Sequence, residues 1–147
     1  MRDKQVRDAV GVVCLLFGLS GCLNLGIGLA PTVGNLQQSV VSEGEALPEF
    51  ARAAGGVGVV YVSGQIVGRL RCDYLVSDLK EVSGGMEISV TVVSGRQGCN
   101  SRQPSTLSYL GNIFNLDPGP MTVVVKHRYQ GVTGIAGERF NSVVNVN

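Results

Sequence analysis

The chain has 147 residues, with 12 Lys and Arg against 11 Asp and Glu, so its formal net charge is +1. Three of these basic and two of these acidic residues precede residue 22, which leaves nine of each in the remainder. Nucleic-acid binding needs a basic excess on one face to neutralise phosphates, so we expect no nucleic-acid partner. Trp is absent, and a stacking platform for sugars or bases would rest on the tyrosines Tyr61, Tyr74, Tyr109 and Tyr129.

The first 22 residues have the composition of an export signal. A basic start containing Arg2, Lys4 and Arg7 is followed by an almost purely apolar run over residues 9–19. A spanning helix needs about 20 apolar residues, and this run is roughly half as long. A short apolar run after a basic start is typical of a secretory signal peptide. We therefore expect residues 1–21 to be removed from the mature protein.

The end of this segment reads Leu19-Ser20-Gly21-Cys22, which resembles the lipobox of bacterial lipoproteins. The resemblance implies that Cys22 is acylated on sulfur, for example with palmitate, and becomes the new N-terminus. Two or more acyl chains hold a protein stably on a bilayer. Leu23 follows the anchor in place of the aspartate that resembles an inner-membrane retention signal. The resemblance therefore implies an outer-membrane lipoprotein of the cell envelope, facing the periplasm or the surface.

The cysteine count agrees with export. Cys14 leaves with the signal and Cys22 would be lipidated, so Cys72 and Cys99 remain as a pair. In an oxidising compartment such a pair predicts a disulfide, and closing this ring stabilises the fold by about 3 to 4 kcal/mol. A metal site is the competing interpretation. Two cysteines and the single histidine fall short of the four protein ligands that a structural zinc site takes, so we expect no metal and no cofactor.

Residues 22–55 show no consistent hydrophobic period and are interrupted by Gly44 and Pro48. We interpret them as the lipidated N-terminus and a tether that lifts the domain off the bilayer. Residues 45–54 could also form a short helix, because Pro48 is tolerated in a first turn and Gly55-Gly56 would end it. Packing of this segment on the domain is the third alternative, and the sequence leaves all three open.

From residue 56 onwards the hydrophobic period is two, which is the signature of half-buried strands. We predict strands at 57–62, 66–74, 86–92, 107–114, 121–129 and 140–146, with a candidate seventh at 76–82. In the second of these, Cys72 would face the core. Short strands separated by Gly, Asn and Pro turns, without a long helix, predict an all-β fold. We expect an antiparallel β-sandwich of six or seven strands over residues 56–147.

The stretch from Phe114 to Val125 narrows the type of sandwich. Pro118-Gly119 suits a tight turn, since Pro fixes φ and Gly supplies a positive φ, and the following strand places Met121, Val123 and Val125 on one face. The stretch resembles bacterial Ig-like surface sandwiches of the transthyretin-like, carboxypeptidase regulatory-like or collagen-adhesin B type, except that Met121 replaces the usual tyrosine. The resemblance implies a module that stiffens, spaces or binds.

Catalytic constellations are sparse. His127, the only histidine, alternates with Lys126 and Arg128 on a predicted strand. It could serve as a general base for a serine only beside an orienting carboxylate, and the other interpretation is a structural strand histidine. The carboxylates are scattered, without the dense spacing of a calcium loop. We therefore expect no enzyme and no catalytic residue.

The candidate binding patch combines two predicted strand faces. Arg69, Arg71 and Asp73 share one face, and Lys126 and Arg128 share another. If these strands are neighbours, they form a positive patch for an anionic glycan, a lipid head group or a partner carboxylate. The competing interpretation is an ordinary solvated face of an antiparallel sheet.

These features predict a lipid-anchored envelope domain with a non-enzymatic binding or structural spacer role. Its partners would be the membrane, through the lipid anchor, and an envelope protein or glycan. The alternative is a small carbohydrate-binding or inhibitor-like module. An exposed aromatic platform would favour sugar binding, and a protruding rigid loop would favour inhibition.

Overall fold

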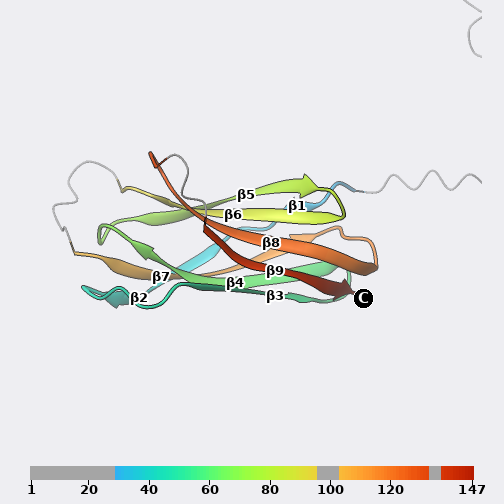
Figure 1. Ribbon diagram of the computed structural model, residues 1–147, viewed down its shortest axis with the longest axis horizontal. Helices are drawn as coiled ribbons and strands as arrows, with labels where there is room; N and C mark the ends of the chain where they lie inside the picture. Colours follow the sequence, from blue (N-terminus) through green and yellow to red (C-terminus); the bar gives the residue numbers. More distant parts are fainter. Residues whose placement is uncertain (1–28, 96–102, 133–136) are drawn as a thin grey trace, which may run out of the picture.

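The computed structural model describes residues 29–95, 103–132 and 137–147, which form two β-sheets packed face to face (Figure 1). In chain order the strands are β1 (Thr32–Val33), β2 (Gln37–Glu43), β3 (Phe50–Gly55), β4 (Val59–Gly68), β5 (Tyr74–Val82), β6 (Gly85–Val93), β7 (Ser105–Phe114), β8 (Gly119–Tyr129) and β9 (Gly137–Val146). The described part contains no helix. The predicted all-β sandwich is confirmed, with nine strands rather than six or seven.

The first sheet, sheet A, has the order β1-β7-β4-β3, and β2 also pairs with β7 beyond the end of β1. The second, sheet B, has the order β5-β6-β8-β9. All pairs are antiparallel except β6 and β8, which run parallel. A parallel pair needs a crossover connection. After β6 the chain crosses to sheet A, where it forms β7, and then returns to sheet B as β8. The expected antiparallel sandwich thus contains one parallel pair.

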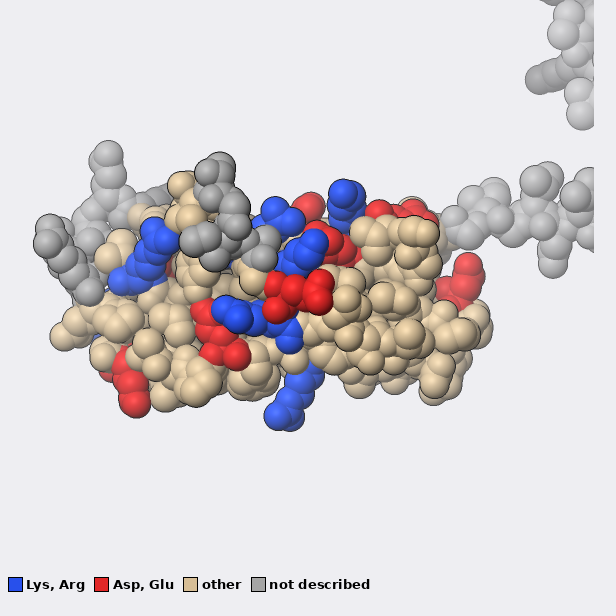
Figure 2. All heavy atoms as spheres, viewed as in Figure 1, with Lys and Arg blue, Asp and Glu red and all other residues tan. Residues whose placement is uncertain are grey.

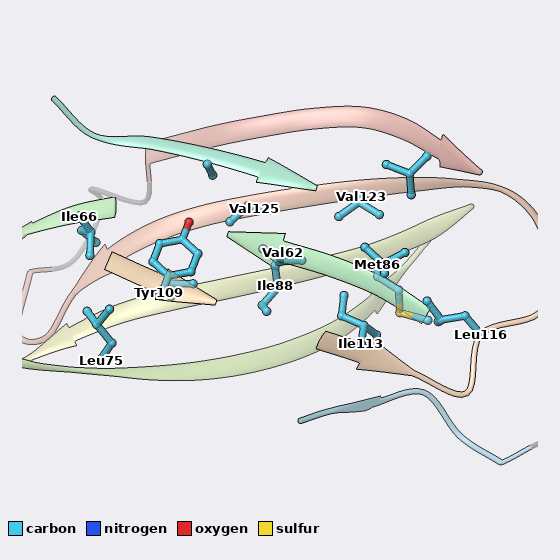
Figure 3. Close-up of a cluster of buried hydrophobic side chains, with 14 of the residues drawn as sticks. Val62, Ile66, Leu75, Met86, Ile88, Tyr109, Ile113, Leu116, Val123 and Val125 are labelled. Atoms are coloured by element: carbon cyan, nitrogen blue, oxygen red, sulfur yellow. The ribbon is translucent and has the colours of Figure 1, made fainter. Parts of the chain in front are cut away.

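The core fills the space between the sheets with branched aliphatic side chains. Figure 3 shows Val62 and Ile113 from sheet A meeting Ile88, Val123 and Val125 from sheet B. All five are fully buried, as the alternation of apolar residues along β6, β7 and β8 predicts. Burying such a side chain contributes about 1.5 to 3 kcal/mol, so this layer is the main source of cohesion between the sheets.

The two long sides of the sandwich are closed by contacts between edge strands. On one side an ideal Cβ built on Gly55 of β3 would lie 1.7 Å from the carbonyl oxygen of Asn145 on β9, so the backbones meet there as only glycine allows. The Asn147 amide donates to the Gly56 carbonyl at 2.9 Å. On the other side, the Gln38 amide oxygen of β2 accepts from the Leu75 amide of β5 at 2.6 Å. Each edge of sheet A is therefore tied to an edge of sheet B.

The predicted strand at 66–74 is wrong in its second half. Strand β4 runs through Ser63-Gly64 and ends at Gly68. A turn follows, because the Asp73 carboxylate accepts from the amides of Arg69 at 2.7 Å and Leu70 at 2.9 Å. Cys72 lies in this turn, partly buried, rather than on a strand facing the core. The candidate seventh strand at 76–82 is present as β5.

The boundary expected at residue 56 is also corrected. Residues 32–55 are not a tether, because β1 and β2 pair with β7 and β3 pairs with β4. The short helix considered at 45–54 is wrong, since β3 occupies its second half. At the other end of the domain, Gly119 has a φ of 136°, which agrees with the turn predicted at Pro118-Gly119, and Val123 and Val125 share the inner face of β8 as expected.

Candidate functional site

A cluster of polar side chains lies between the two sheets, centred on Glu49 in the segment just before β3. One carboxylate oxygen accepts from the Val67 amide of β4 at 3.1 Å and from the Tyr129 hydroxyl of β8. The other accepts from Nε and Nη2 of Arg139 on β9 at 3.0 and 2.6 Å. Glu49 therefore contacts one strand of sheet A and two strands of sheet B. We call Glu49, Tyr109, His127, Tyr129 and Arg139 the Glu49 network.

His127 on β8 extends this network into the core. Its Nδ1 lies 3.3 Å from the second carboxylate oxygen of Glu49, and its Nε2 lies 2.9 Å from the Tyr109 hydroxyl. An ionised carboxylate only accepts hydrogen bonds, so Nδ1 donates to Glu49, while Nε2 is hydrogen-bonded to the Tyr109 hydroxyl. The two rings meet edge to face with centroids 5.7 Å apart. Both nitrogens of the histidine are therefore satisfied.

The pKa values in the network follow from this geometry. Burial raises the pKa of the Glu49 carboxyl, but hydrogen bonds from His127, Tyr129, the Val67 amide and Arg139 outweigh burial and lower that pKa to about 2. Burial and the neighbouring Glu49 carboxylate raise the pKa of both Tyr109 and Tyr129 above the ordinary value of 10.0. Glu49 is therefore ionised, and the two phenols are protonated, at physiological pH.

The chemistry open to this site is limited by access. His127 is 1% exposed and Tyr109 is 3% exposed. The general-base interpretation of His127 required a serine and an orienting carboxylate. The carboxylate is present as Glu49, but the group on Nε2 is the phenol of Tyr109. The arrangement ties the sheets together through satisfied buried groups.

The residues of the candidate patch come from both sheets. Arg69 and Arg71 lie in the turn after β4, which belongs to sheet A, whereas Lys126 and Arg128 lie on β8 in sheet B. The strands are therefore not neighbours in one sheet, as the patch required. Asp73 is 6% exposed and caps the turn. The predicted strand face fails because the chain reverses direction at 69–73. The alternation of side chains along the sequence does not reveal this reversal.

The basic members of the patch all have partners. Arg71 pairs with Glu43 at 3.0 Å. The Arg69 guanidinium lies 5.4 Å from the centroid of the Tyr129 ring, within cation–π range. Lys126 and Arg128 both contact Glu87 of β6, at 2.6 and 3.3 Å, and Arg128 also donates to the Ser89 hydroxyl at 2.9 Å. The hydrogen bond from Lys126 lowers the pKa of Glu87.

The predicted lipidation site and half of the predicted disulfide lie outside the described residues. These are Cys22 and Cys99. Cys72 is described, and an ideal Cβ built on Gly95 would lie 2.9 Å from its Sγ. The chain leaving β6 therefore passes directly beside Cys72, four residues before Cys99. The pairing stays a prediction, and this approach brings Cys99 within chain reach of Cys72.

The outer faces of the two sheets differ in charge. Figure 2 shows acidic and basic side chains gathered across the middle of the face in view, where β6, β8 and β9 run in Figure 1. Glu87, Lys126 and Arg128 belong to this face of sheet B. The outer face of sheet A, which we call the neutral face, comprises Gln37, Ser39, Phe50, Arg52, Ala54, Tyr61, Ser63, Gln65, Ser108, Leu110, Asn112 and Phe114. Arg52 is its one charged member.

Aromatic and aliphatic side chains are exposed on the neutral face. Tyr61 is 49% exposed, Leu110 47% and Phe114 41%. Of the four tyrosines considered as a stacking platform, Tyr61 lies on this face and Tyr74 lies on β5 of sheet B, whereas Tyr109 is buried and Tyr129 is partly buried.

Sequence reasoning missed Glu49, the centre of the network, and most of the neutral face. Glu49 sits in a segment without a period, and its side-chain partners follow it by 78 to 90 residues, so no local signal marks it. The neutral face does leave a signal, because Tyr61, Ser63 and Gln65 alternate with inward residues along β4. Such alternation shows that a face is exposed but does not show which strands share it.

Within the described residues, no group of three or more His, Cys, Asp or Glu is placed to hold a metal ion. The same part of the chain contains no helix long and apolar enough to cross a membrane. No protein-family model, curated protein or solved structure matches the chain. The functional argument therefore rests on the residues themselves.

Proposed function

We propose that the protein is a lipid-anchored domain of the bacterial cell envelope with a non-enzymatic binding or structural role. The observation that carries the proposal is Leu19-Ser20-Gly21-Cys22 after the apolar run at 9–19. An acylated Cys22 would hold the chain on the outer membrane, facing the periplasm or the surface. The first strand begins at Thr32, so about ten residues would link the anchor to the sandwich.

The burial of His127 and Tyr109 supports the non-enzymatic part of the proposal. A catalytic group must touch its substrate, and the one histidine is enclosed between the sheets. The resemblance of Phe114–Val125 to Ig-like and carboxypeptidase regulatory-like modules points the same way, because such modules stiffen, space or bind.

The experiment compares Cys22→Ser with wild type in the native host. Wild type should fractionate with the membrane, and mass spectrometry should find a lipid-modified peptide that begins at Cys22. The Cys22→Ser variant should lose the lipid. Cys14→Ser is the matched control, because it replaces a cysteine inside the signal and should leave lipidation unchanged. An intact segment from Met1 to Cys22 in the mature protein would contradict the proposal, as would a hydrolytic activity that folded His127→Gln lacks.

The alternative function, a carbohydrate-binding module, is favoured by the neutral face. Tyr61 and Phe114 expose aromatic surface on the same face of sheet A. An exposed aromatic surface is expected of a sugar-binding module and is not needed for a purely structural role.

A further inference from the structure

The neutral face carries two aromatic rings seated over glycines. An ideal Cβ on Gly56 would lie 2.8 Å from Cε2 of Tyr61, and one on Gly34 would lie 2.8 Å from Cε2 of Phe114. Each ring therefore packs against the backbone of a glycine, and both side chains remain partly exposed to solvent. Val59 pairs with Phe114 and Tyr61 pairs with Asn112, so Tyr61 and Phe114 occupy diagonal positions on neighbouring strands, about 7 to 8 Å apart at the backbone.

Polar side chains without hydrogen-bond partners in the described part of the chain share this face with the rings. The side chains of Gln37, Ser63 and Tyr61 make no hydrogen bond within the described residues. The amide oxygen of Asn112, which lies directly opposite Tyr61, is buried and has no hydrogen-bond partner there either. A buried unsatisfied acceptor is costly. The accessible members of this set, Gln37, Ser63 and Tyr61, offer donors and acceptors but no charge.

The rows of the sheet make the face continuous. Gln37, Leu110 and Ser63 are cross-strand neighbours, and Asn112 and Tyr61 form the next outward-facing row. Between β2 and β7 the surface is hollowed to about 240 Å³, lined by Gln37, Gln38, Ser39, Ser108, Tyr109 and Leu110. The hollow therefore lies at Leu110, one outward-facing row away from Asn112 and Tyr61.

We propose that the neutral face binds an uncharged glycan chain. The C–H face of a sugar ring packs against the negative face of an aromatic ring, and Tyr61 and Phe114 provide two such surfaces. Sugar hydroxyls are matched by neutral amides and hydroxyls, which Gln37, Ser63 and the Tyr61 hydroxyl supply. The neutral face holds a single charged side chain, Arg52, which stacks at 5.2 Å on the Phe50 ring at the rim, so a highly charged partner finds no set of opposite charges to match its own. This inference rests on the proposed binding role and names its ligand class.

The test measures binding of the detergent-solubilised full chain by calorimetry. The probes are a neutral linear oligosaccharide, chitohexaose, and an anionic one, an alginate oligomer. We expect chitohexaose to bind and alginate not to bind. Tyr61→Ala and Leu110→Ala should each weaken chitohexaose binding, with Tyr61→Ala costing roughly fivefold to tenfold, whereas Tyr61→Phe should retain most of it.

The matched control is Tyr74→Ala, since Tyr74 is 41% exposed but lies on β5 in sheet B. It should bind as wild type does. Equal losses in Tyr61→Ala and Tyr74→Ala would overturn the inference, as would binding of alginate alone or of neither probe. A dimer that Leu110→Ala dissociates, without sugar binding, would assign the face to a second copy instead. The Cys22 fractionation is independent of these outcomes, so failure here leaves the anchored domain standing.

Discussion

Glu49 and His127 are joined at 3.3 Å across the interior of the sandwich, although 78 residues separate them in the chain. The carboxylate comes from the segment before β3 and the imidazole from β8. Because the same carboxylate also accepts from the Val67 amide of sheet A, a single side chain holds both layers in register. The network is therefore a structural element whose loss can be measured.

We expect Glu49→Gln to lower the free energy of unfolding by about 2 to 4 kcal/mol, because it leaves Arg139 without its carboxylate and mismatches buried donors. The midpoint and slope of urea denaturation measure the change. Glu43→Gln is the matched control, since Glu43 pairs with Arg71 at 3.0 Å where both side chains are about half exposed. It should cost less than about 1 kcal/mol. Equal costs for the two variants would contradict the network.

The depressed pKa of Glu49 predicts how stability depends on pH. A carboxyl whose folded pKa is about 2, against an ordinary 4.5, contributes stability that is fully present above about pH 5. That contribution is lost as the pH falls toward 2. The loss from this group should reach about 3 kcal/mol. Urea titrations between pH 6 and 2 should show a shallower acid slope in Glu49→Gln than in wild type. Identical slopes would refute the assignment.

The strands that sequence reasoning found are those with one buried and one exposed face. Met86 to Val92 alternates apolar and polar residues, and it forms β6 with its apolar residues inside. The pattern fails at 66–74, because Asp73 folds the chain back with two local hydrogen bonds while the spacing of side chains continues unchanged.

The strands that sequence reasoning missed lie at the edges. Strand β2 reads Gln37-Gln38-Ser39-Val40-Val41-Ser42-Glu43 and is exposed along nearly all of its length, so it has no apolar period. Strand β3 is rich in Ala and Gly because it must approach β9 closely at Gly55. Strand β2 pairs with β7 across 62 to 73 residues of the chain, and a local period carries no information about such pairing.

The proposed disulfide gives the third prediction. If Cys72 and Cys99 are bonded, Cys72→Ser should lower the melting temperature by roughly 10 °C or more, as expected for about 3 kcal/mol. A reductant should lower the melting temperature of wild type by a similar amount and leave Cys72→Ser unchanged. Non-reducing peptide mapping should recover the linked peptides. Two free thiols in protein from the native envelope would disprove the pairing.

The contact between β3 and β9 gives the fourth prediction. We expect Gly55→Ala to destabilise the protein by about 2 to 3 kcal/mol, because its Cβ would collide with the Asn145 carbonyl and backbone atoms cannot rotate away. Gly111→Ala is the control. The nearest atom to its Cβ is Cδ1 of Leu36 at 3.1 Å, a side-chain end that can move, so its cost should stay below about 1 kcal/mol.

Hydrogen exchange tests where the damage from Gly55→Ala falls. The Asn147 amide donates to Gly56, and the Gly58 amide donates to Asn147, each at 2.9 Å, so both bonds span the seam that the new Cβ would open. Their exchange should accelerate in Gly55→Ala at a pH and temperature where the variant remains folded. The Leu75 amide, bonded to Gln38 on the opposite side, should accelerate no more than the global loss of stability requires. Uniform acceleration at all three amides, or none at the seam, would show that β3 and β9 do not close the sandwich as described.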